Sequence, residues 1–133
     1  MENHGRSNLT EQGLFRHLQG PTNPLKSRNQ GSKAYSAKHP QALAKLSALP
    51  VSKQIGAALK ATHDNQCVVL TSSNGSGKTT MVLIATVLDS LQSGIGVACT
   101  QPRILPTISV ARHVVQQQEV ELGQEIGYRI GFD

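Results

Sequence analysis

Large aromatic side chains are scarce in this sequence. It has no tryptophan, and aromatic residues make up only 3% of its 133 residues. A core must therefore be assembled from Val, Ile, Leu and Ala, because few large side chains can anchor it. Hydrophobic residues amount to 38% and charged residues to 16%, which suits one small globular domain and argues against two.

Cysteines and long apolar runs are also few. Cys67 and Cys99 are the only cysteines, and each lies in a short apolar run, so we expect both to be buried and predict no disulfide framework and no metal site. No apolar run approaches the roughly 20 residues that span a bilayer. The N-terminal sequence lacks the apolar region of a secretory signal. We expect an intracellular protein of a reducing compartment, without membrane attachment.

Acidic residues are scarce in the first part of the chain. Residues 1 to 50 hold seven Lys/Arg against two acidic residues, whereas residues 51 to 133 hold six of each. A basic segment can bind RNA phosphates by releasing their counterions, and a solvated basic tail fits the same composition equally well.

The polar composition changes near residue 40. Residues 1–39 are rich in Gly, Ser, Asn, Gln and Lys and are predicted to be disordered. Residues 40–133 are predicted to form the folded domain. Helical periodicity predicts helices from Pro40 to Leu49, from Ile55 to about Asp64, from Lys78 to about Leu91 and from Ile108 to about Val120.

Short apolar runs between these helices predict strands. They cover residues 67–71, 95–100 and, at the C-terminal end, 125–132. The order strand, loop, helix, strand describes a right-handed βαβ unit. The expected fold is therefore α/β, with a parallel sheet.

The loop between the first strand and its helix has the composition of a phosphate-binding loop. Its sequence is Ser72-Ser73-Asn74-Gly75-Ser76-Gly77-Lys78-Thr79-Thr80. Inward-facing backbone N–H groups and the positive end of the next helix bind phosphate in such loops. Gly75 and Gly77 allow close approach, Lys78 reaches the terminal phosphates, Thr79 offers its hydroxyl to magnesium, and Thr80 lies near the α-phosphate.

The match to the pattern G-x-x-x-x-G-K-[ST] is incomplete, because Ser72 occupies the first glycine position. We expect Ser72 to adopt a left-handed or extended conformation at a cost of about 1 kcal/mol, which weakens nucleotide binding without abolishing it. A Ser/Gly turn between a strand and a helix that binds no ligand is the alternative.

Four motifs occur in order: Leu49-Pro50-Val51, the loop, Thr100-Gln101-Pro102-Arg103, and Gly127-Tyr128 with Ile130. From Leu49 to Asp133 the chain resembles the DEAH-box RNA helicase family, in its pre-mRNA-splicing and ribosome-biogenesis branch. The resemblance implies the start of a first RecA-like domain of the P-loop NTPase fold. It also implies ATP and Mg²⁺ as cofactors, held by the loop residues Asn74, Gly75, Ser76, Gly77, Lys78, Thr79 and Thr80, with Thr79 on the metal.

The resemblance further implies that Thr100, Gln101, Pro102 and Arg103 contact RNA, with Arg103 on a phosphate. The alternative is that Pro102 ends a strand and Arg103 is a solvated surface charge. Spliceosomal or ribosome-assembly proteins are implied as partners, and a nuclear location is favoured over a cytoplasmic one.

The chain also departs from the family pattern, at Ser72, Ser73, Asn74, Met81, Ile104, Pro106, Thr107 and Gly131. It contains no DEAH sequence and no second RecA-like domain, so we expect no catalytic residues in this fragment and no hydrolysis by it alone. Two further hypotheses stay open. The chain could be a non-catalytic, degenerate helicase fragment that binds RNA or a helicase partner, or an unrelated P-loop enzyme.

Overall fold

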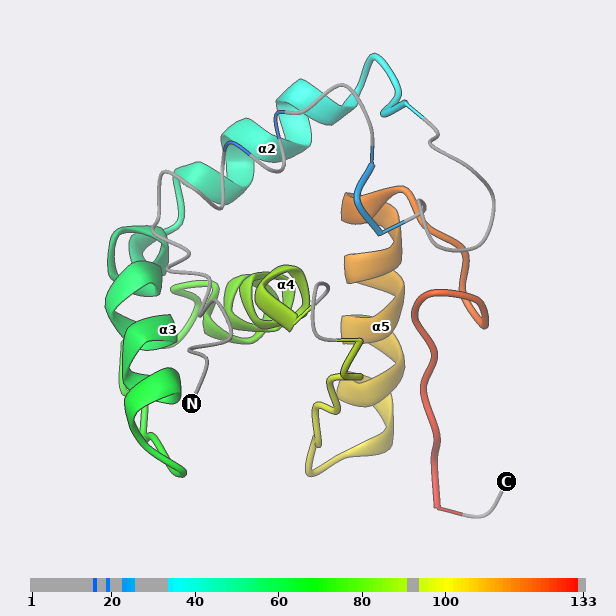
Figure 1. Cartoon of the computed structure of the whole chain (residues 1–133). Helices are drawn as coiled ribbons and strands as arrows, with labels where there is room; N and C mark the ends of the chain where they lie inside the picture. The colour runs from blue at the N-terminus through cyan, green and yellow to red at the C-terminus, as the bar shows by residue number, and fades with distance from the viewer. Residues whose placement is uncertain (1–15, 17–18, 20–22, 26–33, 91–93, 132–133) are drawn as a thin grey trace.

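A computed structural model of the chain describes residues 16, 19, 23–25, 34–90 and 94–131 (Figure 1). Helices dominate these residues. They are α2 (His39–Ser47), the 3₁₀ helix η2 (Pro50–Gln54), α3 (Ile55–Asp64), α4 (Lys78–Ser90) and α5 (Ile104–Gln118). None of the helices in the described ranges is long and apolar enough to cross a membrane.

Prolines set the boundaries of the first helices. Pro40 lies in the first turn of α2 and Pro50 in the first turn of η2, where a missing N–H removes no helical hydrogen bond. Leu49, between the two helices, is extended with φ −67° and ψ 138°, as expected for a residue that precedes proline. The chain therefore bends between α2 and η2, and η2 continues directly into α3.

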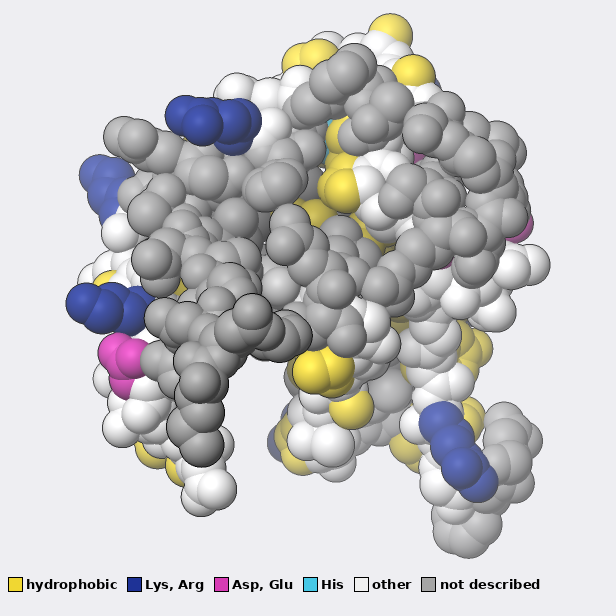
Figure 2. All heavy atoms as spheres, in the orientation of Figure 1, with side chains coloured by type: hydrophobic (Ala, Val, Ile, Leu, Met, Phe, Trp, Pro, Cys, Tyr) yellow, Lys and Arg dark blue, Asp and Glu magenta, His cyan; other side chains and the backbone are white. Residues whose placement is uncertain are grey.

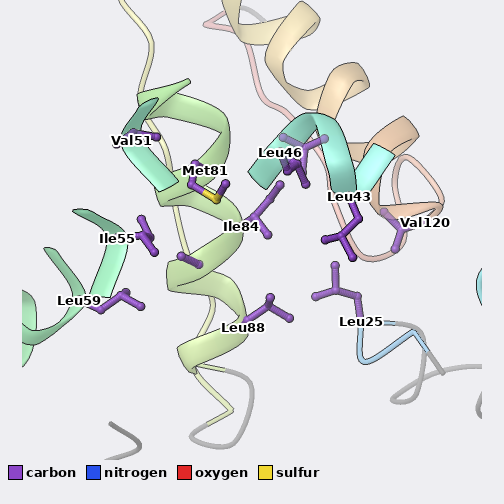
Figure 3. Packing of buried hydrophobic residues seen from close by; sticks show 12 residues of the cluster. Leu25, Leu43, Leu46, Val51, Ile55, Leu59, Met81, Ile84, Leu88 and Val120 are labelled. Carbon is purple, nitrogen blue, oxygen red and sulfur yellow. The ribbon is translucent and has the colours of Figure 1, made fainter. Parts of the chain in front are cut away.

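Helix α4 occupies the middle of the structure. It contacts α3, η2 and α5, and Figure 1 shows it nearly end-on between α3 and α5, with α2 passing above. Its buried face carries Met81, Ile84, Ala85 and Leu88. The other core side chains converge on this face in Figure 3, where α2, η2 and α3 contribute Leu43, Leu46, Val51, Ile55 and Leu59. The core is aliphatic, as the composition predicted.

The predicted parallel sheet is not present. None of residues 67–71, 95–100 and 125–131 forms a strand, and the pairing found among the described residues is one isolated bridge between Leu122 and Ile126. The prediction of an α/β, RecA-like fold is therefore wrong for this structure, which is helical. An apolar run favours extended chain, but a strand also needs a neighbour about 4.8 Å away that completes its hydrogen bonds. Residues 132 and 133 lie outside the described ranges.

Without a sheet, several apolar side chains meet solvent. Val69 is 85% exposed and Ile95 is 68% exposed. Cys67 and Cys99 are also exposed, so the prediction that both are buried is wrong. They are free thiols on irregular chain, because no sheet covers the runs in which they lie.

Helix α5 begins earlier than predicted, at Ile104 instead of Ile108. Pro106 falls within its first turn, where the backbone N–H groups have no helical acceptor, so the proline does not prevent the earlier start. At the other end, Glu119 caps the helix with a positive φ of 52°.

Part of the N-terminal segment is attached to the end of α5. The Asn23 side chain donates a hydrogen bond to the Gln118 carbonyl, and Leu25 joins the core. Ser36 donates its backbone N–H and its hydroxyl to the Glu119 carboxylate, at 2.7 and 2.6 Å. Burial, with a smaller contribution from Glu119, raises the pKa of Tyr35 to about 12. Most of residues 1–39 lie outside the described ranges, so their disorder stays a prediction.

Candidate nucleotide-binding site

The predicted phosphate-binding loop leads directly into the central helix. A turn places the Ser76 N–H 3.3 Å from the Ser73 carbonyl, and α4 begins at Lys78. Gly75 and Gly77 have φ values of +76° and +87°, which L-residues with side chains rarely adopt. The two glycines therefore turn the backbone of the loop as the sequence predicted.

The amide groups at the start of α4 have no helical acceptor. The first backbone bond of the helix runs from the Met81 N–H to the Gly77 carbonyl at 2.9 Å. The N–H groups of Lys78, Thr79 and Thr80 precede it and are among the first-turn donors that a helix leaves unpaired. No acidic side chain lies in this turn. The arrangement is one that binds anions, since the helix dipole adds positive potential at the same place.

Lys78 folds back over the loop. Its ammonium donates to the carbonyls of Ser72 and Ser73, at 2.8 and 3.0 Å. These acceptors lie at the opposite end of the loop, so the lysine closes the loop against the start of α4. An ammonium held this way carries its charge beside the unpaired amides of the helix, where a phosphate group would bind.

Ser72 is tied to the loop by its side chain as well as its carbonyl. Its hydroxyl lies 2.6 Å from the hydroxyl of Ser76, and Ser76 is almost fully buried. Among the described residues other than glycine, only Glu119 has a positive φ, so Ser72 is not left-handed. The missing first glycine therefore imposes no left-handed strain here, and of the two conformations expected for Ser72 the left-handed one is excluded.

The segment Leu49-Pro50-Val51 packs against the loop. The Val51 N–H donates to the Ser76 carbonyl at 3.4 Å. A Cβ atom on Gly77 would clash with the side chain of Leu49, so the loop backbone packs directly on that leucine. Sequence analysis identified both segments separately and missed this contact, because residues more than 20 positions apart give no local signal of packing.

The two threonines differ in exposure. Thr79 is exposed and Thr80 is half-buried. The Thr79 hydroxyl makes no hydrogen bond to other described residues, which leaves it available as a magnesium ligand beside a bound phosphate. No group of three or more His, Cys, Asp or Glu that could hold a metal ion by itself occurs in the described ranges.

The Thr100–Arg103 segment is a separate and simpler structure. Thr100, Pro102 and Arg103 are exposed, and Gln101 is half-buried with its amide 3.4 Å from the Cys99 sulfur. Arg103 caps α5 through its carbonyl, which accepts from the Thr107 hydroxyl at 2.8 Å. No hydrogen bond or ion pair joins these four residues to the loop among the residues described. Arg103 is thus an exposed residue at the start of α5.

A cavity of about 820 Å³ lies on the other side of α4 from η2. Residues 95–99 and 124–129 form two of its walls, and side chains of α4 and α5, together with Leu25 and Gln101, form the rest. The cavity includes Gln101 but no residue of the loop, so it does not extend the candidate phosphate site. No protein-family model matches the chain.

Proposed function

We propose that this chain binds the phosphates of ATP through Ser72–Thr80 and RNA through Thr100–Arg103, as an ATP-dependent RNA helicase-like protein. One observation carries the nucleotide part: two positive-φ glycines, the unpaired amides of α4 and the Lys78 ammonium meet in one loop. A turn without a ligand needs neither the left-handed glycines nor a lysine folded over it.

The chemistry of binding follows from the contacts of Lys78. Without phosphate, the ammonium is satisfied by two neutral carbonyls. A phosphate offers charged acceptors, whose hydrogen bonds are shorter and about twice as strong. The lysine would therefore move from the carbonyls to the β- and γ-phosphates, while the amides of the loop and of α4 bind the remaining oxygens. The Thr79 hydroxyl would be the protein's ligand to magnesium, which would supply positive charge beside the bound phosphates.

Binding and hydrolysis are separate matters in this proposal. Hydrolysis needs a carboxylate for the metal and a group that positions the attacking water. Neither the loop nor the first turn of α4 carries an acidic side chain. We therefore assign no catalytic residue in the described part of the chain, and propose that it binds ATP·Mg²⁺ without turning it over by itself.

The RNA part of the proposal depends on Thr100–Arg103. Three of these residues are exposed, and Arg103 stands at the start of α5, whose first turn also has no acidic side chain. An arginine with a nearby helix N-terminus suits a phosphodiester group. By the family resemblance, splicing or ribosome-assembly complexes are the proposed setting, with the nucleus as the proposed location.

The alternative function is a non-catalytic helicase-like fragment that binds RNA or a protein partner and does not need ATP. The exposure of Val69, Ile95 and Leu105 favours it, since a protein partner could cover these apolar side chains. In this alternative the loop is a structural turn that Lys78 holds closed.

Titration calorimetry with a non-hydrolysable ATP analogue and Mg²⁺ tests the proposal. Lys78→Ala should weaken binding at least about tenfold, because it removes the charge-assisted bonds to the phosphates, which are worth roughly 1.5–3 kcal/mol. Lys38→Ala, which removes an exposed lysine outside the loop, is the matched control and should bind like the unmodified chain. Equal binding by all three proteins would reject the loop assignment. RNA binding that ignores ATP and survives Lys78→Ala would favour the alternative.

A further inference from the structure

We propose that Lys45, Lys53 and Lys60 form a second nucleic-acid-binding surface, which grips the phosphate backbone of RNA along α2, η2 and α3. We call these three residues the lysine row. All three side chains are exposed, and they come from three consecutive helical elements. Figure 2 shows dark-blue side chains along the flank formed by α2 and α3, with one magenta acidic side chain beside the lowest of them.

The position of the row follows from the packing of these helices. Next to the three lysines in sequence, Leu46, Ser52 and Leu59 are buried and face the core. Burial of those neighbours turns the lysines outward, so the same contacts that fix the helices on α4 also fix the row. Lys53 lies in η2 and Lys60 in α3, which follows η2 without a break, and the 3₁₀ and α-helical rises together place the two residues on a similar face about 11 Å apart along the axis.

The charge of this flank is mainly positive, although Asp64 at the end of α3 lies four residues after Lys60. Residues 34 to 63 contain no Asp or Glu, and the first acidic residue after them is Asp64. Within the described ranges the one ion pair joins His63 to Asp89, at 2.9 Å, and none involves a lysine of the row. The described residues thus form no ion pair with the row, and the one acidic side chain on its helices is Asp64, so the flank keeps a net positive charge that attracts a polyanion.

A nucleic acid suits the row better than a membrane. Binding to an anionic bilayer is strengthened by apolar side chains that insert beside the lysines. The large hydrophobic side chains that are exposed in the described chain lie elsewhere, at residues 68, 69, 95, 104, 105, 122 and 128. A row of separate lysines without aromatic or apolar neighbours fits a chain of phosphates and carries no information about base sequence.

The row deepens the RNA part of the proposed function and does not depend on the nucleotide loop. Arg103 lies at the start of α5, on the opposite side of α4 from α3, as Figure 1 shows by the places of these helices. RNA held by the row would therefore be a contact additional to that at Arg103. It would be insensitive to ATP and to base sequence.

Fluorescence anisotropy with a short labelled oligouridylate, across about 50 to 200 mM salt, tests the row. Lys53→Gln together with Lys60→Gln removes two charges of the row. Arg112→Gln together with Arg129→Gln removes two charges from exposed positions outside it and is the matched control. Circular dichroism and urea unfolding confirm that each variant is folded.

We expect the row variant to reduce the slope of log K against log salt by about 1.4, since each phosphate contact to single-stranded nucleic acid contributes about 0.7. The control should keep the original slope. Equal reductions in both variants would overturn the row, because net charge alone would then explain binding, and an unchanged slope in the row variant would overturn it too. Binding to phosphatidylserine vesicles is measured for the same variants. If the row variant lost vesicle binding but retained RNA binding, the lysines would bind a membrane surface instead of RNA, and the row would be overturned.

The same assay separates the row from the proposed function. If Arg103→Gln leaves RNA binding intact while the row variant weakens it, the assignment of Thr100–Arg103 fails and the row stands. If only Arg103→Gln weakens RNA binding, the assignment of Thr100–Arg103 stands and the row is rejected. The outcome for Lys78→Ala with nucleotide is independent of both.

Discussion

The surroundings of α4 and the segments 67–71 and 95–103 were expected to form one structure, yet they differ in almost every physical respect. Around α4, side chains from α2, η2 and α3 are buried, and the loop is held by hydrogen bonds at both ends. The two segments instead leave Val69 and Ile95 largely exposed and form no strand. The backbone N–H and C=O groups of a helix form hydrogen bonds within the helix, whereas those of an extended segment need a neighbouring strand as their partner.

This difference also separates the two candidate sites. The loop belongs to the packed region, because Leu49 and Val51 support it and α4 continues from it. Thr100–Arg103 belongs to the exposed region and is fixed mainly by its link to α5. A preorganised site loses less conformational entropy on binding. We therefore expect ligand binding to cost less ordering at the loop than at Thr100–Arg103.

The largest expected effect contrasts the core with an exposed apolar residue. Ile55 is fully buried beside α4, so Ile55→Ala should lower the free energy of unfolding by about 2–5 kcal/mol. Val69→Ala should change it by less than about 0.5 kcal/mol, because that side chain already meets solvent. Urea unfolding followed by circular dichroism measures both. A comparable loss in Val69→Ala would show that residues 67–71 are packed, and the contrast would fail.

A smaller contrast lies within the loop. Gly75 and Gly77 both have positive φ, but only at Gly77 would a new Cβ meet the Leu49 side chain. Gly75→Ala should cost about 1–2 kcal/mol from the left-handed conformation alone. Gly77→Ala should cost about 1–3 kcal/mol more from overpacking.

A double-mutant cycle with Leu49→Ala checks the origin of that additional cost. Trimming Leu49 should remove most of the difference between the two glycine variants in urea unfolding. If the difference persists in the Leu49→Ala background, the loop does not rest on that leucine.

The smallest expected effects are differences in the free energy of local opening of the backbone, which can be measured in the unmodified chain. Amide hydrogens in the middle of α4 should exchange slowly, since their opening requires loss of the core. Those of Val68–Leu70 and Val97–Cys99 should exchange with almost no protection, because they make no backbone hydrogen bond to other described residues. Hydrogen exchange read by mass spectrometry would contradict this if both groups were protected alike.

Sequence reasoning succeeded where the information is local. Pro40, the spacing of Leu43 and Leu46, and the Lys78–Leu88 pattern predicted α2 and α4 close to their observed bounds. It failed for α5, where Pro106 was not recognised as a first-turn residue. It failed most for Cys67 and Cys99, because burial of a short apolar run depends on whether other chain covers it.

By itself, the sequence determined the helical periods, the aliphatic core, the glycines that turn the loop and the charge distribution, since each depends on neighbouring residues. Only the tertiary structure decided that the apolar runs do not pair, that the Leu49 side chain contacts Gly77, and that Lys45, Lys53 and Lys60 are exposed while their neighbours are buried. The physical reason is distance along the chain. Pairing and packing join residues whose relative positions are set by the whole fold and by no local pattern.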